Sequence, residues 1–291
     1  MAQTSKNEKW TTVIRPHTGW FDIDIKEVWD YRDLILLFVK RNFIITYKQT
    51  ILGPLWVVVS PLITSVIFTV VFGGIAQIST EGAPQFLFYM AGNAVWSFFS
   101  TCLTGTANTF TNNAGLFGKI YFPRLVQPVS QVLTSLANFG IQFCMFLIFW
   151  VYFLLNPSVE GGVVRPNLWI LALPFILIMV MAFGLGMGII VSSLTTKYRD
   201  LAVVVGFGVS LWMYATPVVY PMSQLDSSPT LKFLVGLNPM TGPVQAYRYA
   251  LLGCGSVSIG ALLYSLAWTA VVLTCGVILF SRIEKTFMDT V

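Results

Sequence analysis

Residues 166–196, PNLWILALPFILIMVMAFGLGMGIIVSSLTT, contain no charged side chain and decide the class of fold. A hydrocarbon core about 30 Å thick requires roughly 20 consecutive apolar residues of helix, and a charge at its centre costs about 3 kcal/mol or more. Five further uncharged stretches are also long enough to cross a bilayer: 49–80, 82–118, 125–159, 201–225 and 249–281. The sequence therefore predicts a polytopic membrane protein.

The composition agrees with this prediction. Hydrophobic residues make up 56% of the chain and charged residues only 10%, whereas about a quarter of a soluble domain is charged. No apolar run precedes the polar first 50 residues, so we expect no cleavable signal peptide. We expect an all-α fold with six transmembrane helices, at about residues 55–76, 86–105, 130–155, 168–194, 201–220 and 258–280.

Lysine and arginine are distributed unequally between the predicted loops. Fourteen lie on one predicted side of the membrane: Lys6, Lys9, Arg15, Lys26, Arg32, Lys40, Arg41, Lys48, Lys119, Arg124, Lys197, Arg199, Arg282 and Lys285. Three lie on the other: Arg165, Lys232 and Arg248. The positive-inside rule then places the N-terminal segment 1–25 and the C-terminal segment 282–291 in the cytoplasm. This asymmetry accounts for the net charge of +5 without nucleic acid as a partner.

Residues 26–50, KEVWDYRDLILLFVKRNFIITYKQT, indicate an amphipathic helix on the cytoplasmic membrane surface. Its charged face holds Lys26, Asp30, Asp33, Lys40, Arg41 and Lys48, and apolar residues such as Trp29, Ile35, Phe38, Val39, Phe43 and Tyr47 cover most of the rest. The helix serves either as an anchor or as a docking element for a cytoplasmic partner. Leu52-Gly53-Pro54 ends this element, which spans 26–53, and begins the first membrane span.

The predicted loop 112–128, NNAGLFGKIYFPRLVQP, is dense in glycine, proline and aromatic residues. Its Gly118-Lys119 pair invites comparison with a phosphate-binding loop. That motif requires glycine at position 113 and serine or threonine at position 120, where the chain has Asn113 and Ile120. We therefore reject an ATP site here.

Residues 221–256 form the longest external segment. Its apolar pieces 231–237 and 243–252 are too short to cross a bilayer, and irregular backbone at membrane depth must pack on protein or line a water-filled cavity. We expect two short re-entrant helices, and we interpret the outer end of the molecule as a gate.

The ionisable chemistry of the chain is sparse. His17 is the single histidine, no span carries an ionisable residue near its centre, and the four cysteines have no metal-binding spacing. We expect no catalytic residue, no metal site and no cofactor in this chain. Transport would then be driven by a separate cytoplasmic ATPase, which binds ATP and Mg.

The spans are rich in aromatic rings and in glycine. A channel lined by flat rings with few charges suits sugars, although membrane-interface belts and ordinary packing are the alternative for any one ring. The candidate channel residues are Trp56, Tyr89, Trp96, Phe99, Phe207, Trp212, Tyr214 and Tyr220. The Gly184-x-Gly186-x-Gly188 spacing lies within an apolar span and indicates a helix-packing face rather than a dinucleotide site.

Several motifs together resemble the permease subunit of ABC-2-type exporters for O-antigen, capsule and teichoic acid. They are Arg32-Asp33-Leu34, Tyr47-Lys48-Gln49-Thr50-Ile51-Leu52-Gly53-Pro54-Leu55-Trp56, Phe72-Gly73, Lys119-Ile120-Tyr121-Phe122-Pro123-Arg124, Lys197-Tyr198-Arg199-Asp200, Tyr220-Pro221 and Leu237-Asn238-Pro239. The resemblance covers the chain from residue 25 onward. It implies a homodimer in the bacterial inner membrane that binds two ATPase subunits and exports an undecaprenyl-diphosphate-linked glycan.

The resemblance also implies roles for particular residues. ATPase coupling would involve Arg41, Tyr47, Lys48, Leu116, Lys119, Tyr121, Phe122 and Arg124. The external gate would include Asn238, Pro239, Tyr247 and Arg248. Because phosphates favour clusters of cations, the lipid diphosphate would enter near Lys40, Arg41, Lys48, Lys119 and Arg124, although positive-inside charges need no such role.

Two alternatives remain open at this point. An ABC-2 permease for a lipid or a drug would share the same architecture. An ATP-independent flippase for lipid-linked sugars would need neither nucleotide nor partner, but the lack of intramembrane ionisable groups argues against it.

Overall fold

A computed structural model describes residues 25–109, 115, 122–157, 162–195 and 200–290, and it describes side chains as far as Phe280 apart from those of Ile25 and Glu27. All regular secondary structure in these ranges is helical, which confirms the predicted all-α class. The long elements are α2 (Arg32–Tyr47), α3 (Trp56–Phe68), α4 (Gln85–Ala107), α6 (Val126–Leu155), α7 (Leu173–Thr195), α8 (Leu201–Tyr214), α10 (Thr241–Leu252) and α11 (Ile259–Thr290). The short ones are α1 (Ile25–Asp30), η1 (Gly53–Leu55), η2 (Thr69–Ile75), η3 (Leu168–Ala172), η4 (Met222–Leu225) and α9 (Pro229–Gly236).

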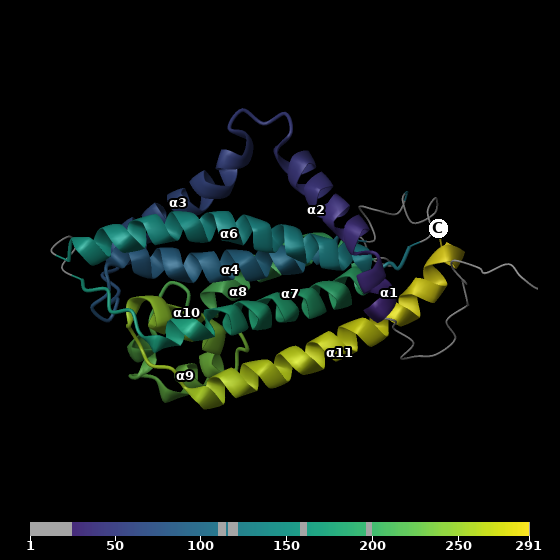
Figure 1. The fold of residues 1–291 in the computed structure, drawn as a ribbon. Coiled ribbons are helices and arrows are strands. Elements are labelled where there is room, and N and C mark those ends of the chain that lie inside the picture. The colour runs from purple at the N-terminus through teal and green to yellow at the C-terminus, as the bar shows by residue number, and fades with distance from the viewer. Residues whose placement is uncertain (1–24, 110–114, 116–121, 158–161, 196–199, 291) are drawn as a thin grey trace, which may run out of the picture.

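Helix α4 lies at the centre of the bundle. In its most apolar 18-residue window, 83% is buried inside the protein. The corresponding share is 17–33% in the other four helical segments that are long and apolar enough to cross a membrane. It contacts α3, α6, α7, α8 and α10, and α11 packs against the opposite side of α7 (Figure 1). Because α4 is enclosed by protein, its small and aromatic residues pack against other helices.

Five of the six predicted spans are confirmed by length and composition: Gly53–Ile75, Gln85–Ala107, Val126–Leu155, Leu168–Thr195 and Ile259–Phe280. The sixth prediction, residues 201–220, is wrong in extent. Helix α8 has only 14 residues, about 21 Å at 1.5 Å per residue, which is less than the hydrocarbon thickness. Helix α8 ends before residue 220 because Pro217 has no N–H to donate and disfavours a helical conformation at Thr216.

The predicted surface helix is present but is divided and packed differently from the prediction. It breaks at Tyr31 into α1 and α2. Ile35 and Phe38 are buried against the start of α6, in a cluster with Phe122 and Val126. Trp29, which the prediction placed on the apolar face, is 68% exposed. Leu36, Leu37, Ile44 and Ile45 are exposed as well, so α2 has a second apolar strip in addition to the one that meets α6.

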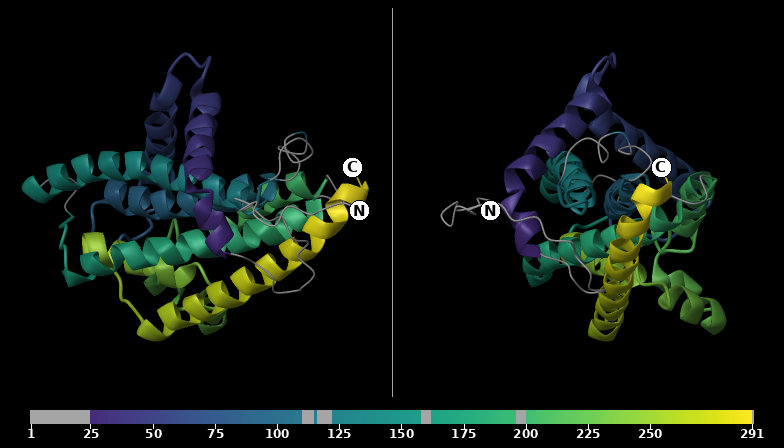
Figure 2. Two further views of the ribbon diagram at one scale, coloured as in Figure 1. Left: turned by 45° about the vertical axis from the view of Figure 1, so that its right-hand side comes forward. Right: turned by 90° about the vertical axis from the view of Figure 1, so that its right-hand side faces the viewer.

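Helices α2 and α3 lean together away from the bundle and meet at the 48–53 turn (Figures 1 and 2). This turn has Gln49 at φ 68° and Gly53 at φ 53°, a left-handed conformation that glycine adopts without strain. The α3 span then continues into η2, a π-helical segment. Segments of this kind frequently occur at functional sites.

The three glycines of α7 make close helix packing possible, as their spacing predicted. A Cβ at Gly184 would lie 2.7 Å from Cys102 Cβ, and one at Gly188 would lie 2.8 Å from Leu103 O, both on α4. A Cβ at Gly186 would instead lie 2.9 Å from the Cα of Leu273 on α11. The prediction of a packing face is confirmed, and α7 uses it on two sides.

Candidate functional site at the α10 end of the bundle

Helices α9 and α10 lie at the end of the bundle opposite α1, which we call the α10 end (Figure 1). They correspond to the two short helices predicted at 231–237 and 243–252. Helix α9 is mostly exposed, whereas α10 is buried among α4, α7, η3 and α11. Gly242 permits this depth, because a Cβ there would lie 3.0 Å from the carbonyl oxygen of Ala261.

Arg248 of α10 is enclosed by protein at this end. It is 3% exposed, its Cζ lies 3.9 Å from the centroid of the Phe88 ring, and its Nη2 donates to the carbonyl of Val218. Gly92 leaves room for the guanidinium, since a Cβ there would lie 2.4 Å from Nη2. Burial lowers the pKa of Arg248 to about 10, so the side chain remains charged at neutral pH.

Of the other predicted gate residues, Asn238 and Pro239 lie in the turn between α9 and α10. The Asn238 amide donates to Thr216 Oγ1 at 2.7 Å and to Ala215 O at 3.2 Å, and its Oδ1 accepts from the backbone N–H of Met240 at 3.0 Å. These bonds tie the turn to the C-terminus of α8. Pro239 follows directly and is half-buried. Tyr247 is fully buried, and its ring lies 6.5 Å from that of Phe146.

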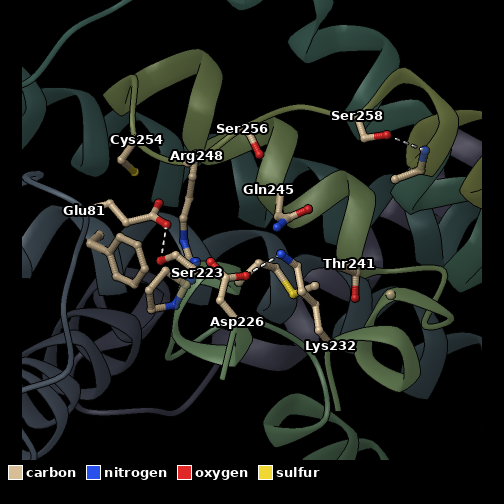
Figure 3. Close-up of a pocket in the computed structure, with 16 residues that line it drawn as sticks. Glu81, Ser223, Asp226, Lys232, Thr241, Gln245, Arg248, Cys254, Ser256 and Ser258 are labelled. Carbon is tan, nitrogen blue, oxygen red and sulfur yellow. Dashed lines mark hydrogen bonds and ion pairs between the residues drawn. The ribbon is translucent and has the colours of Figure 1, made fainter. Parts of the chain in front are cut away.

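A pocket of about 530 Å³ lies beside Arg248. Its charged lining residues are Glu81, Asp226, Lys232 and Arg248, and its other polar side chains include Ser223, Thr241 and Gln245 (Figure 3). Ser223 Oγ donates to Glu81 Oε1 at 2.6 Å, and Lys232 forms an ion pair with Asp226. The pocket is therefore built from segments that are far apart in the sequence.

Sequence reasoning missed Glu81, Ser223 and Gln245 as parts of one site. A signal was present for Glu81, because it is the single charged residue between the uncharged stretches 49–80 and 82–118. It also has a positive φ of 55°, next to Gly82 at φ 81°. A non-glycine residue in this conformation is uncommon and often marks a functional turn.

The predicted channel aromatics divide into buried and exposed rings. Tyr89 and Phe99 are 0% exposed and Trp96 is 4% exposed. Phe99 stacks on Phe183 at 5.5 Å, and Trp212 meets Phe99 at 5.3 Å between ring centroids. In this conformation Tyr89, Trp96 and Phe99 are enclosed by neighbouring side chains, and their channel role remains a prediction.

Other predicted channel rings remain accessible. Phe207 and Tyr214 on α8 are 67% and 52% exposed, and Trp56 at the start of α3 is 45% exposed. Tyr220 is half-buried, and its hydroxyl donates to Tyr214 O at 3.2 Å. Trp212 is half-buried at the edge of the aromatic cluster.

The predicted coupling residues partly converge where α2 meets α6. Phe122 lies 5.7 Å from Phe38 between ring centroids, and the Arg41 guanidinium lies 4.8 Å from the Phe38 ring on the same helix. Arg124 lies two residues before α6 begins and is half-buried. Leu116, Lys119 and Tyr121 lie outside the described residues.

Toward its tip, α2 is held to α6 by polar contacts. Tyr47 Oη donates to Asn138 Oδ1 at 3.4 Å, and the Asn42 amide donates to Gln131 Oε1 at 3.4 Å. Lys40 and Lys48 are exposed. Lys48 follows Lys40 by eight residues, about 12 Å along a helix axis, so Lys40, Arg41 and Lys48 are spread along α2.

Among the residues that the structure describes, no group of three or more histidine, cysteine, aspartate or glutamate side chains could hold a metal ion. The four cysteines are free thiols. Near the pocket, burial raises the pKa of Cys254 to about 11, so this side chain is a neutral thiol at pH 7 rather than a nucleophilic thiolate. The polar chemistry at the α10 end suits binding and helix docking.

The apolar helices and the short helices at the α10 end define a polytopic membrane protein. A model of the ABC-2 type transporter family matches residues 33–252. The chain belongs to this family of ABC transporter membrane domains.

Comparison with curated proteins found three similar relatives at 25–27% identity. One is the O-antigen export system permease protein RfbA of Myxococcus xanthus, 27% identical over 226 residues, which cover 77% of this chain and 82% of that protein. Another is the O-antigen export system permease protein RfbA of Klebsiella pneumoniae, 26% identical over 259 residues, which cover 88% of this chain and 94% of that protein.

Proposed function

We propose that this chain is the permease subunit of an ATP-driven exporter that moves a lipid-linked polysaccharide of the O-antigen type across a bacterial inner membrane. The observation that carries the proposal is its similarity to O-antigen export permeases over 77–88% of its length. Family membership supports a transport role. ATP and Mg would be bound by a separate ATPase subunit, and this chain would contribute no catalytic residue.

The proposed subunit organisation is a homodimer with two ATPases. Several apolar side chains on α3, η2 and α8 are exposed, among them Val66, Val70, Val203 and Phe207, which supports a surface covered by lipid or by a second copy. The ATPase would dock where α2 meets α6, around Arg41, Phe122 and Arg124. The proposed contact also includes Tyr47, Lys48 and the predicted coupling residues Leu116, Lys119 and Tyr121.

The proposed orientation places both termini in the cytoplasm and the α10 end outside. The fourteen-to-three distribution of lysine and arginine supports it. The undecaprenyl-diphosphate group would enter beside Lys40, Arg41 and Arg124, with Lys48 and Lys119 contributing positive potential. Accessible rings such as Trp56, Phe207 and Tyr214 would then contact the glycan, while Asn238, Pro239, Tyr247 and Arg248 position the external gate.

Deletion of the gene tests the cargo. We expect loss of surface polysaccharide together with accumulation of lipid-linked glycan on the cytoplasmic side. Normal surface polysaccharide combined with altered drug or lipid export would contradict the proposed cargo.

A second experiment tests the energy source. The chain purified from its native host should bring down an ABC ATPase, and purified chain alone should show no ATP hydrolysis. Transport of lipid-linked glycan into vesicles by this chain without nucleotide or partner would identify a flippase and overturn the proposal.

A further inference from the structure

The pocket at the α10 end has balanced charge and combines polar with apolar lining residues. Glu81 and Asp226 carry negative charge, whereas Lys232 and Arg248 carry positive charge. A free anion would meet two carboxylates and a free cation would meet an ammonium and a guanidinium. The surrounding serine, threonine and glutamine side chains both donate and accept hydrogen bonds. This combination favours an uncharged ligand that has many hydroxyl groups.

One face of α10 supplies three of the polar lining residues. Thr241, Gln245 and Arg248 follow one another at spacings of four and three residues, which places them on the same side of a helix. All three line the pocket (Figure 3). Because α10 is buried against the bundle, this face is held rigidly, as is typical of binding sites that exist before the ligand arrives.

Arg248 retains hydrogen-bonding capacity toward the pocket. Its guanidinium has five N–H donors, and among the residues that the structure describes no atom accepts a hydrogen bond from Nε. A buried donor without an acceptor costs about 1–3 kcal/mol. Nε itself is enclosed by protein, so a ligand hydroxyl in the pocket would bond to the guanidinium through its other N–H donors.

We propose that this pocket binds one or two uncharged sugar units of a glycan as the polymer leaves the permease, an inference that rests on the proposed export function. Its volume of about 530 Å³ lies within the range of about 300–1,000 Å³ of small-ligand sites. Sugar hydroxyls would bond to Gln245, to Arg248 and to the Glu81–Ser223 pair. Because the lining comes from several separate segments, an occupied pocket would hold them together.

Two substitutions and one control test this site. Gln245→Ala removes an amide from a half-buried position that does not anchor the fold. Asp226→Asn leaves the pocket with one excess positive charge. Gln224→Ala is the matched control, because Gln224 is exposed on the same short helix η4 as Ser223 and does not line the pocket.

The measurement uses the full chain with its ATPase in nanodiscs, titrated with maltose, lactose and cellobiose and followed by saturation-transfer NMR. Glucuronate and inorganic phosphate serve as charged comparators. We expect saturable binding of at least one disaccharide and none of phosphate. Gln245→Ala should weaken disaccharide binding about three- to tenfold, the effect of losing one or two hydrogen bonds, and Gln224→Ala should not change it. Asp226→Asn should allow phosphate to bind.

Three results would overturn the inference: no saturation by any of the disaccharides, displacement of a disaccharide by phosphate in the unsubstituted protein, or unchanged binding in Gln245→Ala. The export proposal is tested separately by gene deletion. Loss of surface polysaccharide on deletion together with an inert pocket would reject only the sugar site. A sugar-binding pocket in a strain whose polysaccharide survives deletion would reject only the proposed cargo.

Discussion

The guanidinium of Arg248 covers the ring of Phe88, with Cζ 3.9 Å from the ring centroid, and its Nη2 donates to the carbonyl of Val218. This contact joins α10, α4 and the segment after α8, three parts of the chain that meet only in the folded protein. Guanidinium–ring contacts away from water contribute about 2 kcal/mol, and hydrogen bonds from charged groups about 1.5–3 kcal/mol. The α10 end therefore depends strongly on one arginine.

Replacement of Arg248 by alanine should destabilise the protein by about 2–4 kcal/mol, because the Val218 carbonyl loses its donor and Phe88 loses its cover. Arg248→Lys should recover only part of the lost stability, since the lysine ammonium lacks the planar, forked N–H donors of a guanidinium. Thermal unfolding in detergent measures the effect. Lys232→Ala, which removes an exposed ion pair, should cost less than about 1 kcal/mol. Equal effects for Arg248→Ala and Lys232→Ala would contradict this interpretation.

Helix packing at α7 should be sensitive to a single methyl group. Gly186→Ala should destabilise the protein by about 1–3 kcal/mol, because the new Cβ would lie 2.9 Å from backbone atoms of Leu273. Gly206→Ala on α8 is the control, since no atom lies within 4 Å of its Cβ position. Thermal unfolding should show a loss for the first variant and no loss for the second. An unchanged unfolding temperature in Gly186→Ala would show that α7 and α11 are separated more widely than the structure indicates.

Docking of α2 on α6 should depend on Phe38. Phe38→Ala should weaken this contact by about 3 kcal/mol, since the ring is buried against Phe122. Hydrogen exchange over residues 32–47 should accelerate, and less ATPase should copurify. Leu37→Ala removes a side chain of the exposed strip and should leave the exchange unchanged. Slow exchange in Phe38→Ala would mean that the polar contacts of Asn42 and Tyr47 suffice to hold the helix.

Buried and exposed aromatic rings should respond differently to truncation. Phe207→Ala and Tyr214→Ala should reduce export of surface polysaccharide several-fold at an unchanged unfolding temperature, because these rings are accessible. Trp96→Ala and Phe99→Ala should instead lower stability by about 3–5 kcal/mol. Export assays and thermal unfolding of all four variants separate the two groups. Normal export in both α8 variants would remove these rings from the proposed channel.

The sequence alone determined the parts of this protein that depend on local chemistry. Long uncharged stretches identified five of the helical spans, because burying charge in hydrocarbon is costly irrespective of neighbours. The spacing of Gly184, Gly186 and Gly188 identified a packing face. Short apolar pieces separated by Asn238-Pro239 identified α9 and α10, and the surface helix was recognised from its charge pattern.

Only the tertiary structure decided which side chains share a site and which are covered. Trp96 and Phe207 are both aromatic residues of apolar segments, yet one is enclosed by neighbouring rings and the other is exposed. Likewise Glu81, Ser223 and Arg248 meet through contacts between distant segments. The physical reason is that bilayer insertion selects for apolar character along each segment, whereas the packing of segments against one another depends on the shapes of many side chains at once.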